Sequence, residues 1–292
     1  MSKESQFLNI ISNTLSDNSY LGNDCAYLAD FGLVVTQDNL VQGVHFDFSL
    51  MSYYEVGLKA VLVNLSDVFA SGSKPLYVSI GISGELNEEF ITEFYQGVNH
   101  VCEQFGVKVI GGDLTSGDKI SISITALGAP WGVVSSLNAA KVGDVICLKG
   151  YAGASALGFS DLVAGVNSEF ISYHKKPELH PKTAQIVSVC AQNPYVMTDL
   201  SDGLYTSLAR ISEMSGVKMC LNYNEIPKLK DDFNSVIYGG EDYSLLCALS
   251  KEHFELVNYK GAGLVPIGLV EAGSGVFVDG KILDKDLSYE HF

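Results

Sequence analysis

The sequence predicts an α+β, or mixed α/β, protein of two domains. Helix and strand signals alternate along its 292 residues, and a hydrophobic content of 47% is ample for packed cores. The segment 131–142 has little periodicity and separates two αβ-rich halves. We therefore expect an amino-terminal domain over residues 1–136 and a carboxyl-terminal αβ domain over residues 137–292.

The first half contains a helix with clear boundaries. Ser52-Tyr53-Tyr54-Glu55 has the spacing of a capping box, which predicts a helix from there toward Ala70, and Gly72 favours its end. The other elements expected in this half are a strand over 76–82, a helix from Asn87 to Gly106, a strand ending at Asp113 and an alternating strand over 120–125 with one polar face.

The second half continues the alternation. Its expected elements are a strand over 145–148, a helix after the loop 150–155, a strand over 195–198 and a helix over 204–214. The loop 150–155 is compatible with two structures. It could bind phosphate at a helix amino terminus, or it could be a tight strand-to-helix turn.

The charge of the chain restricts its partners. Nucleic acid and anionic membranes both require a basic surface, so a net charge of -16 argues against either. An acidic cleft would also repel a phosphorylated substrate unless divalent cations lay between them. The acidic composition therefore predicts that any anionic ligand binds together with metal cations.

Cysteine spacing and hydropathy bear on location. The six cysteines have neither CxxC nor Cys/His spacing, so we expect reduced core residues. The amino terminus lacks an apolar signal segment, and no apolar run approaches the ~20 residues of a membrane span. These features predict a cytoplasmic protein.

Acidic residues recur at the ends of apolar runs, beside glycine, serine or threonine. This placement gathers carboxylates near exposed backbone N–H groups, and Mg²⁺ binds a few carboxylates together with substrate phosphate oxygens. The segments are Gly22-Asn23-Asp24, Thr36-Gln37-Asp38, Asn64-Leu65-Ser66-Asp67, Gly111-Gly112-Asp113, Thr198-Asp199-Leu200-Ser201-Asp202-Gly203 and Gly239-Gly240-Glu241-Asp242. They predict a metal-dependent enzyme that handles phosphate groups. The sequence has no G-x-x-x-x-G-K-[ST] loop, so the carboxylates remain to bind a nucleotide through metal.

Single aspartates also have a simpler interpretation. The polar residues of 199–202 could merely cap the helix that begins near Leu204. Asp67 is more informative, because a carboxylate within an otherwise apolar helix is costly unless it is paired or metal-bound.

Taken in order, these segments resemble the thiamine-monophosphate kinase family. The resemblance spans residues 22–243, and its specific part is Gly43-Val44-His45-Phe46 combined with the segments 200–204 and 239–243. Several motifs occur more loosely in the superfamily of aminoimidazole-ribonucleotide synthetase, selenophosphate synthetase and a hydrogenase-maturation protein. The resemblance implies transfer of the ATP γ-phosphate to thiamine monophosphate, giving thiamine diphosphate. It also implies a homodimer whose amino-terminal domains pair through mixed sheets.

The resemblance assigns roles to individual residues. It implies Mg²⁺ ligands at Asp24, Thr36, Asp38, Asp67, Asp113, Asp199 and Asp202, of which Asp38, Asp67 and Asp113 are expected to be catalytic. It implies ATP contacts at Gly112 and Ser201, and substrate contacts at His45 and Glu241. No general base is needed, because a phosphate monoester with a second pKa near ~6 is already anionic at neutral pH. In-line transfer then depends on alignment and charge neutralisation.

The sequence also departs from the family pattern. Asn23 stands where a second acid is usual, and Leu137 stands where an ATP-contacting arginine is expected. The carboxyl-terminal tryptophan of some relatives is missing, which leaves Tyr289 or Phe292 as substitutes.

Three alternatives stay open at this point. His45 could be a strand-end histidine satisfied by a backbone carbonyl. The chain could be another superfamily enzyme with a different acceptor. It could also be a non-catalytic regulator that binds Mg²⁺ and nucleotide.

Overall fold

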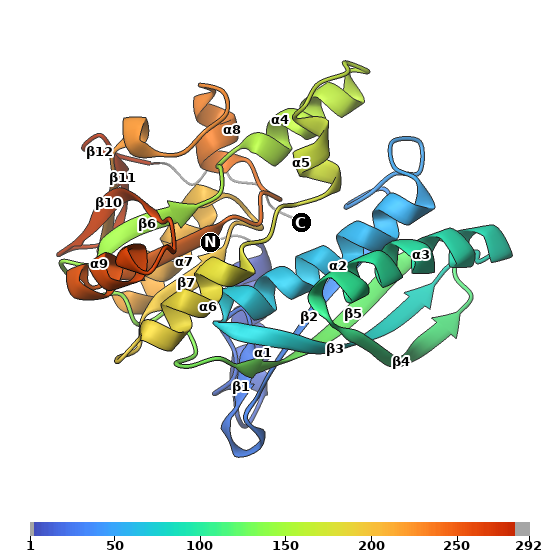
Figure 1. Ribbon diagram of the computed structural model, residues 1–292, viewed down its shortest axis with the longest axis horizontal. Helices are drawn as coiled ribbons and strands as arrows, with labels where there is room; N and C mark the ends of the chain where they lie inside the picture. Colours follow the sequence, from blue (N-terminus) through green and yellow to red (C-terminus); the bar gives the residue numbers. More distant parts are fainter. Residues whose placement is uncertain (1–2, 284–292) are drawn as a thin grey trace.

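The computed structural model describes residues 3–283, which form two sheets one after the other along the chain (Figure 1). The first sheet has the order β1-β2-β5-β3-β4, in which β3 and β4 are parallel and the other neighbours antiparallel. Its strands are β1 Ala26–Leu28, β2 Leu33–Val41, β3 Ser73–Ser83, β4 Lys108–Thr115 and β5 Ser121–Pro130. The predicted mixed α/β class is confirmed.

The second sheet has the order β12-β11-β8-β10-β6-β9-β7. Its strands are β6 Val145–Lys149, β7 Val196–Asp199, β8 Lys218–Leu221, β9 Leu245–Leu249, β10 Val265–Glu271, β11 Gly275–Val278 and β12 Lys281–Ile282. The helices around it are α4 Ala154–Val163, α5 Ile171–Lys175, α6 Pro181–Cys190, α7 Leu204–Ser215, α8 Phe233–Tyr238 and α9 Lys251–Tyr259. Helix α1, Lys3–Thr14, precedes β1, and single 3-10 turns occur at Ala29–Phe31 and Tyr223–Glu225.

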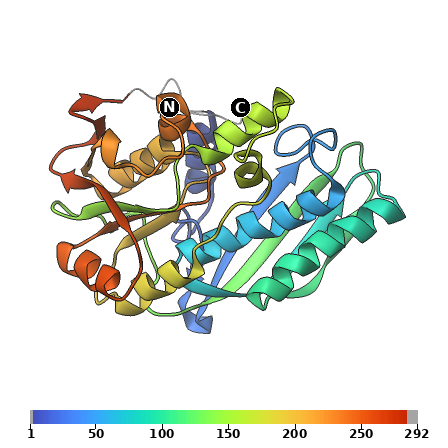
Figure 2. The ribbon, with the colours of Figure 1, turned by 45° about the horizontal axis from the view of Figure 1, so that its top comes forward.

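Two long helices cover one face of the first sheet (Figure 2). They are α2, Tyr53–Ala70, and α3, Glu88–Phe105. The predicted capping box is present, because Ser52 Oγ accepts the Glu55 N–H (3.2 Å) and the Glu55 carboxylate accepts the Ser52 N–H (2.8 Å). Gly106 ends α3 in the left-handed conformation. Local signals therefore predicted both helices correctly.

Glycine allows α2 and α3 to cross at close range. A Cβ atom on Gly57 would lie 2.1 Å from the carbonyl oxygen of Phe94. Reciprocally, a Cβ on Gly97 would lie 2.1 Å from the carbonyl oxygen of Tyr54. The two backbones thus touch where neither helix carries a side chain.

Helix α2 lies between the two sheets. It packs against β2, β3 and β5 on one side and against β7, α5 and α6 on the other. As a result, 14 of its 18 residues are buried, which means that any polar side chain on it needs a partner inside the protein.

The connection between the sheets is held on both sides. Ser135 Oγ donates to the carbonyl of Ala70 in α2 (3.0 Å) and to that of Met197 in β7 (2.8 Å). The first sheet ends at Pro130 and the second begins at Val145. A domain boundary near Ser136, between them, stays a prediction.

Four of the six cysteines are buried, as expected of core residues, whereas Cys190 and Cys220 are half-buried. None of the six cysteines, all of which lie in the described part of the chain, forms a disulfide. Within residues 3–283, no helix combines the length and apolar character needed to cross a bilayer.

We predict that Gly97→Ala lowers the unfolding free energy by about 1–3 kcal/mol, because the added methyl group forces α3 away from α2. The control is Gln96→Ala, which changes the exposed neighbour and should leave the melting temperature unchanged or slightly higher. Thermal melts followed by circular dichroism measure both. Equal melting temperatures for the two variants would show that the helix crossing tolerates a side chain.

Candidate active site

A cavity of about 660 Å³ lies between elements of the two halves of the chain. Its wall includes β2, α2 and the loop between them, together with α4, α5 and the turns at 201–203 and 239–243. Six predicted site residues line it, namely Asp38, His45, Asp67, Ser201, Asp202 and Glu241. Tertiary structure therefore joins motifs that are about 200 residues apart in the sequence, such as those of Asp38 and Glu241.

Three of the predicted carboxylates line the cavity together. Asp38 comes from β2, Asp67 from α2 and Asp202 from the turn after β7. Thr36 and Asp199 are buried behind them. Thr36 Oγ1 donates to Asp67 Oδ2 (2.6 Å), and Ser66 Oγ donates to Asp199 Oδ2.

Burial and mutual repulsion change the titration of this cluster. Burial, and after it the charges of Asp202 and Asp24, raises the pKa of Asp38 to about 6. Burial is also the main cause of the raised pKa of Asp67 and of Asp199, with further contributions from neighbouring carboxylates. A bound cation would relieve this repulsion and stabilise the ionised forms.

Asp24 has a cationic partner. Arg210, the only arginine of the sequence, donates from Nη1 to Asp24 Oδ1 (3.2 Å) and from Nη2 to the carbonyl of Gly22 (2.7 Å). Burial still raises the pKa of Asp24, although Arg210 opposes it. Sequence reasoning missed Arg210, because it lies within α7 and outside every glycine-flanked motif.

The donor set fits Mg²⁺. Carboxylate and hydroxyl oxygens are hard ligands, which suit Mg²⁺ better than a soft metal. In the described part of the chain, no three His, Cys, Asp or Glu side chains already converge as a closed metal site. Asp38, Asp67 and Asp202 line an open cavity instead, and Mg²⁺ in proteins usually keeps water and phosphate oxygens among its ligands.

The predicted residues on β4 lie apart from this cluster. Strands β5 and β3 separate Asp38 from Gly112, which is in register with it, so three strand spacings of ~4.8 Å, or roughly 14 Å, lie between them. Asp113 is the next residue along β4, and alternation turns its side chain to the opposite face of the sheet. One copy of the chain therefore does not bring Asp113 together with the other predicted ligands.

His45 is positioned by the strand that precedes it. Its Nδ1 accepts the backbone N–H of Val41 (3.0 Å), so the proton of the neutral ring is on Nε2. This bond fixes the imidazole on the cavity wall.

Glu241 occupies an unusual backbone conformation. Its φ of 62° is left-handed, and its N–H donates to the carbonyl of Ser201 (2.6 Å), which joins the turns 239–243 and 201–203. Glu241 Oε1 lies 3.0 Å from Lys59 Nζ, and Oε2 lies 3.3 Å from His174 Nδ1. Sequence reasoning did not single out Lys59 or His174. Lys59 carried a usable signal, since it is a charge within the apolar run of α2.

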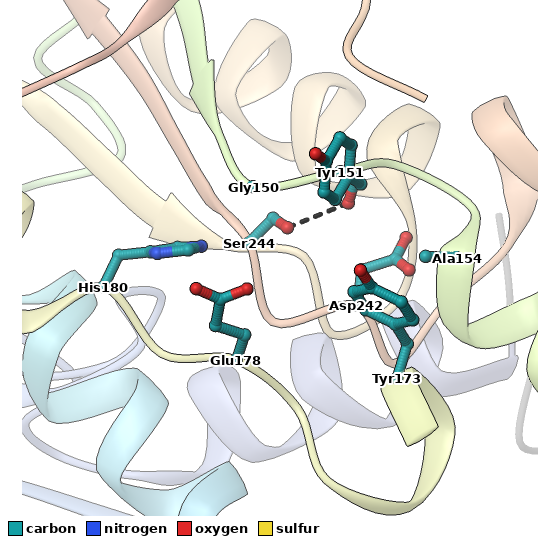
Figure 3. A pocket seen from close by; sticks show the side chains of 8 residues that line it. All are labelled: Gly150, Tyr151, Ala154, Tyr173, Glu178, His180, Asp242 and Ser244. Atoms are coloured by element: carbon teal, nitrogen blue, oxygen red, sulfur yellow. Dashed lines mark hydrogen bonds between the residues drawn. The ribbon is translucent and has the colours of Figure 1, made fainter. Parts of the chain in front are cut away.

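Asp242, the residue after Glu241, caps the start of α4. Its carboxylate accepts the N–H groups of Gly153 (2.6 Å) and Ser155 (2.8 Å) at the start of α4. These donors are therefore occupied, and the loop 150–155 is a strand-to-helix turn rather than a phosphate site. Figure 3 shows Asp242 facing a small cavity of about 10 Å³, room for one water molecule, which His180 also borders.

Two departures from the family pattern are explained by packing. Asn23 Oδ1 accepts the N–H of Leu137 (2.9 Å), so it holds the connection between the sheets. Leu137 is 2% exposed and belongs to the core of the second sheet. Its side chain does not line the cavity, so Leu137 makes no contact there, and its correspondence to the family's arginine stays a prediction. Tyr289 and Phe292 lie outside the described residues.

Comparisons with known proteins place this geometry in a family. Residues 22–129 match the family model of the AIR synthase related protein, N-terminal domain. The chain is 32% identical to thiamine-monophosphate kinase of Aquifex aeolicus (strain VF5), with 98% of this chain and 96% of that protein covered. It is 31% identical to thiamine-monophosphate kinase of Bacillus subtilis (strain 168), with 84% and 81% covered.

Solved structures of similar proteins have the same fold. AaThiL complexed with AMPPCP and TMP superposes with a TM-score of 0.89 at 29% identity, over 99% of this chain and 97% of that one. The HypE-HypF complex shares the fold at a TM-score of 0.77, with 18% identity over 96% of this chain and 99% of the matched one. Since two relatives exceed 30% identity over most of their length, the chain belongs to the thiamine-monophosphate kinase family.

Proposed function

We propose that the chain transfers the γ-phosphate of ATP to thiamine monophosphate by direct in-line displacement, giving thiamine diphosphate. The observation that carries this proposal is one cavity whose lining includes both a group of carboxylates, Asp38, Asp67 and Asp202, and the residues His45 and Glu241. The similar AaThiL is complexed with AMPPCP and TMP, a pair of ligands that corresponds to the two substrates.

The protein's part in the reaction is alignment and charge balance. Mg²⁺, when bound, supplies positive charge that brings the phosphate groups of both substrates together. Asp38, Asp67 and Asp202 would hold it at the cavity, and Asp24 and Asp199 would add negative charge behind them. The accepting phosphate oxygen is already anionic near neutral pH, so no side chain has to remove a proton.

The acceptor contacts follow from the same wall. His45 offers its Nε2–H to a phosphate oxygen, and Glu241 offers a carboxylate to a hydrogen-bond donor. Phe46, Phe159 and Leu162 also line the cavity and give apolar surface for the rings of thiamine.

We also infer a homodimer that completes this site. All eight residues of β4 are exposed, and three of them, Val109, Ile110 and Leu114, are large and apolar. On the other edge of the sheet, β1 covers only residues 33–35 of β2, and within residues 3–283 no strand pairs with residues 36–41 on that side. Such open edges favour pairing with another chain. If β4 of one copy pairs with this edge of its partner, Asp113 and Gly112 come next to the partner's Asp38.

The activity itself gives the first test. We expect γ-phosphate transfer from ATP to thiamine monophosphate in the presence of Mg²⁺, measured as thiamine diphosphate formed. His45→Ala should raise the KM for thiamine monophosphate by about tenfold or more, as for loss of one hydrogen bond to a charged group, and change the KM for ATP little. No product from any phosphorylated acceptor would favour a non-catalytic regulator, and equal changes in both KM values would make His45 structural.

Metal removal gives a second test. Asp38→Asn takes one charge out of the buried cluster, so it should raise the melting temperature of the metal-free protein by a few degrees, equivalent to about 1 kcal/mol. The same variant should lose most of the stabilisation that Mg²⁺ with ATP gives the wild type. Asp30→Asn, at an exposed aspartate, is the control and should change neither value. A lower metal-free melting temperature for Asp38→Asn would contradict the repulsion.

Mixed dimers give a third test. Asp67→Asn and Asp113→Asn should each be inactive alone. In heterodimers of the two, one cavity combines an intact cluster from one copy with an intact Asp113 from the other. Refolded together in equal amounts, they should therefore recover about a quarter of wild-type activity. Absence of recovery in a confirmed heterodimer would place Asp113 in the site of its own chain.

A further inference from the structure

Lys59 is a buried cation behind the cavity wall. It lies within α2 at 1% exposure, and its Nζ is 3.0 Å from Glu241 Oε1. The Glu241 side chain is 32% exposed and lines the cavity. The pair is asymmetric, because the protein hides the cation and presents the anion to a ligand.

A second contact holds the other carboxylate oxygen of Glu241. His174 Nδ1 lies 3.3 Å from Oε2, and Ser155 Oγ lies 3.2 Å from the same nitrogen. Burial, and after it the charge of Lys59, lowers the pKa of His174 to about 4, so the ring is neutral at physiological pH. Lys59 is therefore the charged partner of Glu241 in this trio.

The backbone presents Glu241 to both partners. Its left-handed conformation and its N–H bond to the carbonyl of Ser201 place it in a turn of the second half of the chain. Its side chain reaches α2, in the first half, through Lys59 and α5 through His174. The ion pair thus connects the two halves at the cavity.

We propose that Lys59 is a positioning residue that acts on the acceptor through Glu241. The inference rests on the proposed function and extends it. Lys59 fixes the direction of the Glu241 carboxylate and balances its charge, so Glu241 accepts a hydrogen bond from the acceptor without repelling its phosphate. A buried ion pair is a weak source of stability compared with apolar packing. The carboxylate it presents to the cavity therefore explains Lys59 better than stability does.

A double-mutant cycle tests the proposal. Lys59→Met keeps the length of the side chain and removes its charge. It should raise the KM for thiamine monophosphate by roughly 10- to 100-fold, with the KM for ATP changed by less than about threefold. Glu241→Gln should raise the same KM. The double variant should match Glu241→Gln within about twofold, because Lys59 has nothing left to position.

A neighbouring ion pair supplies the control. Lys175 Nζ of α5 contacts Glu55 of α2 at 3.0 Å, so Lys175→Met removes an ion pair that also involves α2 but does not line the cavity. It should leave the KM for thiamine monophosphate unchanged. If Lys59→Met and Glu241→Gln have multiplicative effects on KM, or if Lys59→Met changes only kcat, the positioning role is wrong.

Melting temperatures test the Lys59–Glu241 pair independently of the proposed function. Lys59→Met alone leaves a carboxylate without its cation, so the double variant should melt at a higher temperature than Lys59→Met. This comparison needs no substrate and also covers the case in which the single variant folds poorly. Equal melting temperatures would refute the Lys59–Glu241 pair, whereas a wild type inactive on thiamine monophosphate would refute the function and leave the pair in place.

Discussion

The burial of α2 between two sheets is the constraint on which the site depends. A helix buried along nearly its whole length can carry polar side chains only if each has a partner inside the protein. Asn64 accepts the N–H of Asp38 in β2, Ser66 donates to the carboxylate at the end of β7, and Lys59 pairs with the turn 239–243. The first and third pairings attach lining segments of the cavity to α2, and the second attaches the strand that precedes the turn 201–203, so the packing of α2 sets the geometry of the site.

The cavity combines two kinds of carboxylate. In the aspartate cluster, burial and mutual repulsion raise the pKa of Asp38, Asp67 and Asp199, so a bound cation would stabilise the ionised carboxylates. Glu241, by contrast, has its cation built into the protein as Lys59. In the proposed function, this difference would let one acidic cavity attract Mg²⁺ at the cluster and stay nearly balanced in charge at Glu241, where the acceptor is proposed to bind. Buried charged groups such as these aspartates and Lys59 are unusual in a protein interior and are expected mainly at functional sites.

In the proposed homodimer, the open edges of the first sheet would complete the candidate site. Asp113 and Gly112 belong to β4, an exposed edge strand. Strands β5 and β3 lie between β4 and the strand β2 that carries Asp38. Gly112 has to be glycine there, because a Cβ would lie 1.8 Å from the carbonyl oxygen of Ile80. A strand so tightly fitted to its neighbour and so exposed on its other side is suited to pair with a second copy.

The sequence by itself determined the family, the mixed α/β class and the helices whose ends carry caps, because motifs and caps are local patterns. The capping box at Ser52 and the stop at Gly106 needed no tertiary information. Tertiary structure decided which predicted residues share a cavity, since strand order is a long-range property. It separated Asp113 from Asp38, gave the donors of loop 150–155 to Asp242, and buried Leu137 in a core. It also revealed Lys59 and His174 as partners of Glu241, because a contact between α2, α5 and a turn near residue 240 exists only after the chain has folded.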